Sequence, residues 1–264
     1  MTATAQASIE EADGILTVTL TRDEKLNAIT PEMTAVLWEA HDAVATRDDL
    51  RALVITARGR FFTAGIDLAA ESPSDAPTGS EFRRRYREHH ALYDAFEALE
   101  KPVVLAAQGP CLGAGVEMAG SCDFRFAAEG TWFQLPEVTI GTVAGSGGIS
   151  RINRIIGPAW TKWMAMAARK VDAERALAIG LVHEVYPVEG FQQRVHDVVR
   201  EIVALPVQAL GASKLVIDMT TEVDRATARD IERLANTSLI FGAEYTEARA
   251  AFNAKSAAKN APGS

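Results

Sequence analysis

Two glycine-dense stretches near the middle of the chain restrict its fold more than any other feature. They read QGPCLGAGVEMAGSCD at 108–123 and FQLPEVTIGTVAGSGG at 133–148. Neither stretch can form an uninterrupted helix or strand, because glycine weakens both and takes backbone conformations closed to other residues. Such a density of glycine is typical of backbone that lies close to a ligand. We therefore expect turns and helix starts here, around a binding site.

Strand-like and helix-like segments precede these stretches. Alternating apolar and β-branched residues predict strands over 14–20, 52–57 and 103–107. Thr30 followed by Pro31 predicts a helix start, with apolar residues at helical spacing after it. Pro, Ser and Asp predict a mobile loop at 71–79, followed by a helix. Its arginines predict a solvent-exposed helix face; they are Arg83, Arg84, Arg85 and Arg87.

The last third of the chain favours helix. Two short helices and a strand are expected over 158–186, and helix from 190 to about 256 with breaks at Pro206 and near Gly242. We therefore divide the chain into a core over residues 1–195 and a C-terminal helical region over 196–264.

Charge and cysteine content narrow the class of protein. Lys and Arg number 27 against 35 Asp and Glu, a net charge of −8, which disfavours nucleic acid and anionic membrane as partners. Two cysteines do not make a disulfide scaffold. Neither a signal peptide nor a membrane-spanning run is recognisable. We expect a soluble cytoplasmic protein.

Glu117 and Glu137 are the candidate catalytic groups. Both have apolar neighbours in sequence, and burial of neighbouring carboxyl groups raises their pKa values toward those that general acid–base catalysis requires. Glu117 follows residues 113–115, which predict a helix start with free N–H groups, and residues 61–68 predict a second such loop. Two backbone donors from these loops would form an oxyanion hole. Taken alone, however, a helical Glu is more often a solvated surface residue, and glycines are often only turns.

Three other readings compete with this one. Residues 113–115 followed by Glu137 suggest a dinucleotide site, but QGPCL separates the glycines from the strand. Ser146 lies in a near match to a nucleophile elbow, with His183 and His196 as possible bases of a serine hydrolase. The third is a protein that binds acyl-CoA or RNA without turnover. No histidine pattern indicates a metal site.

From about residue 15 to 255 the chain resembles the crotonase (enoyl-CoA hydratase/isomerase) superfamily. Six motifs in order carry the resemblance: LTRDEKLNAIT, FFTAGIDL, KPVVLAAQGPCLGAGVEMAGSCDFRFA, FQLPEVTIGTVAGSGGISRI, ARKVDAERALAIGLVHEVYP and ARAAFNAK. The resemblance implies an α/β fold, a spiral of ββα units followed by a helical trimerisation region. It also implies homotrimers or dimers of trimers, and a place in fatty-acid metabolism such as β-oxidation.

The resemblance also assigns roles to residues. Glu117 and Glu137 match the two glutamates that add water to a trans-2-enoyl-CoA, and the N–H groups of Ile66 and Ala114 match the oxyanion hole. No cofactor or metal is implied, because coenzyme A belongs to the substrate. The positions that match substrate and coenzyme A contacts are Lys25, Leu26, Ala28, Ala64, Gly65, Asp67, Leu68, Gly113, Gly141, Phe252 and Lys255.

Departures from the family pattern leave the substrate open. FTAGIDL is similar to dienoyl-CoA isomerases, but these carry Asp at the position of Glu117 and a further acid at that of Gly145. Leu135 stands where many members have Gln. The resemblance therefore favours a hydratase, with an isomerase or another acyl-CoA lyase or dehydratase as the alternative.

Overall fold

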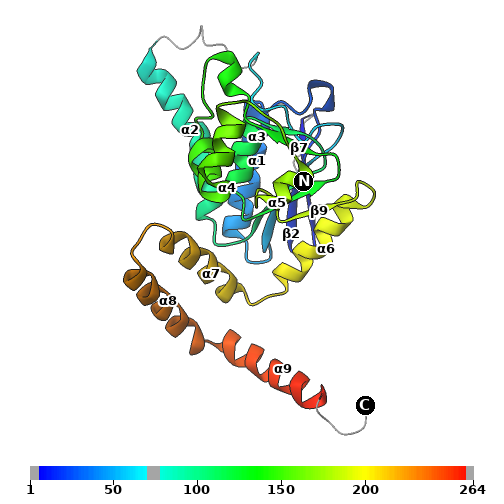
Figure 1. The fold of residues 1–264 in the computed structure, drawn as a ribbon. Coiled ribbons are helices and arrows are strands. Elements are labelled where there is room, and N and C mark those ends of the chain that lie inside the picture. Colours follow the sequence, from blue (N-terminus) through cyan, green and yellow to red (C-terminus); the bar gives the residue numbers. More distant parts are fainter. Residues whose placement is uncertain (1–5, 70–77, 260–264) are drawn as a thin grey trace. The chain divides into compact units, whose positions relative to one another are not determined.

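The structure, a computed structural model, describes residues 6–69 and 78–259 (Figure 1). Part of the loop predicted at 71–79 lies outside the described residues. The chain divides into two compact units, residues 1–200 and 201–264, and each is described by itself.

A six-stranded sheet forms the centre of the first unit, in the order β1-β2-β3-β4-β6-β9. β1 pairs antiparallel with β2, and all other neighbours are parallel. The strands are β1 (Ala7–Ala12), β2 (Ile15–Leu20), β3 (Ala52–Ala57), β4 (Val103–Ala107), β6 (Phe124–Ala128) and β9 (Glu184–Tyr186). Every residue of β3 and β4 is buried, as unbroken apolar runs in a covered parallel sheet require. The three strands expected before residue 108 are confirmed.

A smaller sheet has the order β5-β7-β8, with β5 (Cys111–Leu112), β7 (Trp132–Gln134) and β8 (Val171–Asp172). Its parallel β5–β7 pair brings the two glycine-dense stretches together, since Cys111 is in register with Phe133. Cys111 and Cys122 are both buried free thiols.

Helices cover the main sheet. α1 (Pro31–Thr46) begins at the expected cap, where the Thr30 side chain accepts a hydrogen bond from the Met33 N–H, and α1 packs against β2. The others in this unit are α2 (Gly79–Ala98), α3 (Ala114–Gly120), α4 (Gly148–Ala165), α5 (Ala173–Ala178) and most of α6 (Phe191–Val203). α3 packs against α4, which is kinked at Gly157 with Pro158 after it. A helix over 148–156 was not predicted, because the glycines before it hid its start.

The second unit contains α7 (Val207–Thr220), α8 (Arg225–Ile240) and α9 (Ala243–Lys259). The breaks at Pro206 and near Gly242 are confirmed, but a further break at 221–224 was missed. Large apolar side chains are exposed on this unit, and Phe241 has 86% of its surface accessible. Within the described residues, no single helix meets the length and hydropathy expected of a membrane span, although α6 and α7 together pass that test as a bent pair.

Candidate active site

The first glycine-dense stretch places a helix start at the site. Gly113 precedes α3 with φ +53° and ψ −121°, a conformation that only glycine adopts at low cost. Its carbonyl accepts hydrogen bonds from the N–H groups of Val116 (2.8 Å) and Glu117 (3.1 Å). The Ala114 N–H, the first of the helix, has no acceptor within the described part of the chain. It remains available to a ligand.

A second loop lies against this helix start. Gly65 has φ +97°, and a Cβ built on it would lie 3.6 Å from the Ala114 nitrogen. The next N–H, that of Ile66, likewise finds no acceptor among the residues described. The two N–H groups predicted to bind an oxyanion therefore lie on backbone segments that contact each other.

Glu117 is buried beneath these loops, with 4% of its surface accessible. Its Oε1 accepts a hydrogen bond of 2.8 Å from the Ser146 N–H. Burial raises the pKa of Glu117 to about 7, and the charge of Glu137 adds to the rise, while backbone donors at Ser146 and Gly148 and the cation of Arg151 oppose it. This carboxyl group can therefore both take up and release a proton near neutral pH.

Glu137 lies beside the same helix start, as the first residue of a 3-10 helix, η3 (Glu137–Ile140). A Cβ on Gly113 would lie 2.9 Å from the Glu137 Oε1, so the glycine makes room for this carboxylate. Its Oε2 is buried and has no hydrogen-bond partner in the described structure. Burial raises the pKa of Glu137. Glu137 thus has a buried oxygen that can accept a hydrogen bond from a polar ligand, and its charge acts on Glu117.

Arg151 on α4 is a site residue that the sequence did not single out. Its Nη1 donates a 2.9 Å hydrogen bond to the Ser146 carbonyl, and its Nη2 bonds Asp94 and, at 2.7 Å, the Glu97 Oε2 on α2. A Cβ on Gly147 would lie 2.0 Å from Nη1. Arg151 lies in the GISRI motif, but only the fold reveals that it holds the Ser146 turn.

Tyr86 on α2 is a second residue that was missed. Burial raises its pKa, the charge of Glu117 adds to the rise, and hydrogen bonds with the Ser146 side chain and the Gly145 backbone oppose it. The predicted solvent-exposed face of this helix is confirmed for Arg83, Arg84 and Arg87, while the Arg85 side chain lies outside the described structure. The charged sequence around Tyr86 gives no sign that its ring faces the site.

The segment predicted to contact coenzyme A lies against the oxyanion loop. The Leu26 carbonyl accepts a hydrogen bond from Ala64 (2.9 Å), and the Ile29 N–H donates to the Gly65 carbonyl (2.8 Å). Lys25 is exposed and Ala28 half-buried. These hydrogen bonds hold the 26–29 segment against the loop that carries the Ile66 N–H.

The remaining predicted residues differ in environment. Asp67 pairs with Arg22 at 2.6 Å, Leu68 is exposed, and Gly141 ends η3 with φ +79°. Phe252 is exposed on α9 in the second unit, and the Lys255 side chain lies outside the described structure. The roles of these residues stay predictions.

The serine-hydrolase reading finds no support in the geometry. Ser146 has 2% of its surface accessible, and its side chain acts on the pKa of Tyr86. His183 Nδ1 accepts a hydrogen bond from the Arg125 N–H at 3.1 Å. Among the described side chains, no group of three or more His, Cys, Asp or Glu is arranged to hold a metal ion.

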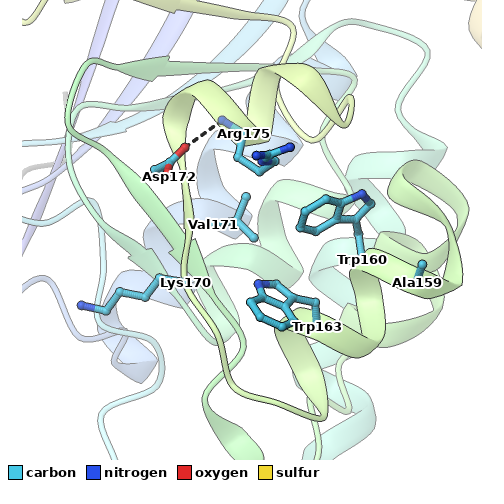
Figure 2. Close-up of a pocket in the computed structure, with 7 residues that line it drawn as sticks. All are labelled: Ala159, Trp160, Trp163, Lys170, Val171, Asp172 and Arg175. Atoms are coloured by element: carbon cyan, nitrogen blue, oxygen red, sulfur yellow. Dashed lines mark hydrogen bonds between the residues drawn. The ribbon is translucent and has the colours of Figure 1, made fainter.

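A cavity of about 550 Å³ lies elsewhere, between α4 and the β8–α5 segment (Figure 2). Figure 2 shows the indoles of Trp160 and Trp163 facing it, with the Lys170 amine pointing away. That amine lies 3.6 Å from the centre of the Trp132 ring. None of the predicted site residues lines this cavity, so it is separate from the two glutamates.

Comparisons with known proteins agree with this geometry. A family model described as enoyl-CoA hydratase/isomerase matches residues 10–260. Crotonyl-CoA hydratase of Syntrophomonas wolfei is 34% identical over 224 residues, which cover 83% of this chain and 84% of that protein. The mitochondrial Delta(3,5)-Delta(2,4)-dienoyl-CoA isomerase of Homo sapiens is 35% identical over 186 residues, covering 66% of this chain and 56% of that protein.

Solved structures share the fold. An enoyl-CoA hydratase from Bacillus anthracis superimposes with a TM-score of 0.88 at 26% identity, over 95% of this chain and 96% of that one. The chain therefore belongs to the enoyl-CoA hydratase/isomerase family. The predicted superfamily and its α/β fold are confirmed.

Proposed function

We propose that this protein hydrates trans-2-enoyl-CoA thioesters to 3-hydroxyacyl-CoA and catalyses the reverse dehydration. The observation that carries the proposal is the buried Glu117 and the half-buried Glu137, whose Oε2 has no partner, together with two backbone N–H groups that find no acceptor among the described residues. The crotonyl-CoA hydratase named above supports the reaction class. The same chemistry needs no metal and no cofactor other than the coenzyme A of the substrate.

In the proposed reaction the thioester carbonyl oxygen accepts hydrogen bonds from the N–H groups of Ile66 and Ala114. These bonds strengthen as negative charge develops on that oxygen, and each well-aimed donor stabilises the transition state by about 3–4 kcal/mol. Polarisation makes Cβ electrophilic. The positive end of α3 adds to the effect, because its first N–H points toward the oxyanion.

The two glutamates then add the elements of water. The ionised carboxylate of the pair takes a proton from water, whose oxygen bonds to Cβ, and the protonated carboxyl gives its proton to Cα. The pair thus loses one proton and gains another, and returns to its starting charge. A pKa near 7 at Glu117 with an ionisable partner beside it suits this exchange.

The alternative, an enoyl- or dienoyl-CoA isomerase, receives less support from the site. Gly145 supplies no third carboxylate, and the Tyr86 phenol fills the space beside it. Long-range proton transfer across a diene lacks a base there. Isomerisation stays the alternative because the dienoyl-CoA isomerase of Homo sapiens is similar in sequence to this chain.

Kinetics on Glu117→Gln and Glu137→Gln test the proposal. We expect each to lower kcat for a short trans-2-enoyl-CoA by about a hundredfold or more, within the range that acid–base groups contribute, with little change in the Kd of a saturated acyl-CoA. Glu129→Gln, on an exposed turn, is the control. Unchanged turnover in either variant would refute the two-glutamate mechanism, and migration of a double bond without water addition would favour the isomerase.

We also propose that residues 201–264 mediate assembly into a homotrimer or a dimer of trimers. Monomeric proteins rarely expose large contiguous apolar surfaces, and this unit exposes several large side chains: Leu215, Ile217, Met219, Leu234, Phe241 and Phe252. Size-exclusion chromatography with light scattering should show three or six chains, and a monomer at micromolar concentration would contradict the proposal.

A further inference from the structure

The Tyr86 phenol contacts a turn that is far from it in sequence. A Cβ built on Gly145 would lie 2.3 Å from the Tyr86 Oη and 3.0 Å from both Cε1 and Cζ. No side chain fits at position 145 while the ring stays in place. The ring and this glycine therefore define one packed contact between α2 and the turn before α4.

Two neighbours on α2 fix the direction of that ring. Phe82 stacks on it with the centroids 5.4 Å apart and the planes 20° apart, and His90 meets it edge-on at 4.6 Å and 61°. The three residues follow at intervals of four and so share one helix face. Burial lowers the pKa of His90, which favours the neutral ring. Tyr86 is thus held in an uncharged aromatic row.

The turn that Tyr86 contacts also holds Glu117. The Ser146 N–H donates to the Glu117 Oε1 at 2.8 Å, and Arg151 donates to the Ser146 carbonyl at 2.9 Å. The Tyr86 hydroxyl packs against the Gly145 backbone of this turn, and the Ser146 side chain and the Gly145 backbone both act to lower the pKa of Tyr86. Three contacts therefore fix the peptide whose N–H orients the buried carboxylate.

We propose that Tyr86 is a positioning residue for Glu117, whose hydroxyl locks the Gly145–Ser146 turn so that the Ser146 N–H stays aligned on the carboxylate. The catalytic part of this inference rests on the proposed function. The structural part, the effect on the carboxyl group itself, does not depend on it.

Tyr86→Phe is the direct perturbation, because it keeps the stacked ring and removes only the hydroxyl. We expect kcat to fall about tenfold with KM changed less than about twofold, since the hydroxyl supports the geometry of the reacting group and not substrate binding. A less well aligned donor stabilises the charged carboxylate less, so the pKa of Glu117 should rise. The other groups that act on this carboxyl are Glu137 from η3, Arg151 from α4 and Tyr93 from α2.

The experiment compares wild type, Tyr86→Phe and the control Tyr186→Phe, which alters a half-buried tyrosine on the edge strand β9. The pH profile of kcat is measured with a short trans-2-enoyl-CoA. For Tyr86→Phe the acidic limb should move upward by about half a pH unit or more, whereas the control should match wild type. An unchanged limb together with unchanged kcat would overturn the inference.

Gly145→Ala provides a second variant. Its methyl group collides with the Tyr86 Oη, so in wild type it should lower kcat by about tenfold or more by disturbing the turn. In the Tyr86→Phe background the closest contact is gone, and the same change should cost clearly less. Effects that simply multiply would mean that the tyrosine does not act through this turn.

The Glu117 carboxyl can also be titrated directly by carbon-13 NMR of protein labelled at glutamate, with Glu117→Gln assigning the signal. If wild type hydrates no thioester, the proposed function fails, yet this titration still tests Tyr86. A higher pKa in Tyr86→Phe supports the positioning role, and an unchanged one refutes it.

Discussion

Replacing the buried carboxyl of Glu117 by an amide should make the protein more stable in alkaline solution. The folded protein holds the pKa of Glu117 at about 7, against a value of 4.5 for an unperturbed side chain. Between these pH values the folded state binds more protons than the unfolded state. The free energy of unfolding therefore falls as the pH rises from 4.5 to about 7.

The size of the effect follows from the two pKa values. The difference between the two pKa values corresponds to about 3 kcal/mol of unfolding free energy. Wild type loses this stability completely above pH 7 and loses none of it below pH 4.5. Glutamine keeps the shape, and its carbonyl oxygen can still accept from the Ser146 N–H, which is 2.8 Å from Oε1 in wild type. Glu117→Gln should thus match wild type near pH 4 and exceed its stability by about 3 kcal/mol at pH 8.

Urea unfolding at one protein concentration, followed by circular dichroism at pH 4 and pH 8, measures this difference. The control Glu129→Gln removes the same charge at an exposed position and should show a much smaller change between the two pH values. If Glu117→Gln is no more stable than wild type at pH 8, the carboxyl group is not destabilised by burial. Its proposed role near neutral pH would then lose its physical basis.

Two further substitutions test the support around the glutamates. Gly113→Ala places a Cβ 2.9 Å from the Glu137 Oε1 at a backbone with φ +53°; we expect about 1–3 kcal/mol of destabilisation and at least about a tenfold loss of kcat, measured by thermal unfolding and steady-state kinetics. If Gly113→Ala keeps the kinetics of wild type, the close contact between position 113 and the Glu137 carboxylate is refuted. Arg151→Met leaves the Ser146 carbonyl without its donor, at a cost of about 1–3 kcal/mol in urea unfolding. It should also raise the pKa of Glu117 by removing a nearby cation, so a lower pKa would contradict this account.

Local patterns were enough to predict much of the fold. Thr30 and Pro31 are a local signal for the start of α1, and the alternating β-branched residues at 15–20 are a local signal for β2. Neither signal depends on residues far away in the sequence. The break at 221–224 was missed because its signal is a single capping side chain. Asp224 accepts hydrogen bonds from the N–H groups of Ala226 and Thr227, and such a cap resembles any other acid in a polar helical sequence.

The sequence predicted the glycine loops and the two glutamates of the site, but not the side chains that pack around them. Gly113 and Gly65 could be read as loops near a ligand, but their contact with each other depends on strand pairing between distant segments. Tyr86 and Arg151 act on residues of the Ser146 turn, and Tyr86 lies in a charged helix. Packing between elements decides such contacts, so sequence patterns alone could not reveal them.

The fit between Gly145 and the Tyr86 ring also matters to anyone who wishes to redesign this enzyme. A library that varies position 145 alone, for example to introduce an acid there, would meet the phenol oxygen at 2.3 Å in every member. Productive variants should be found only when both positions are randomised together. The two positions would then have to change together, because a side chain at position 145 is tolerated only after a substitution of Tyr86 has opened space for it.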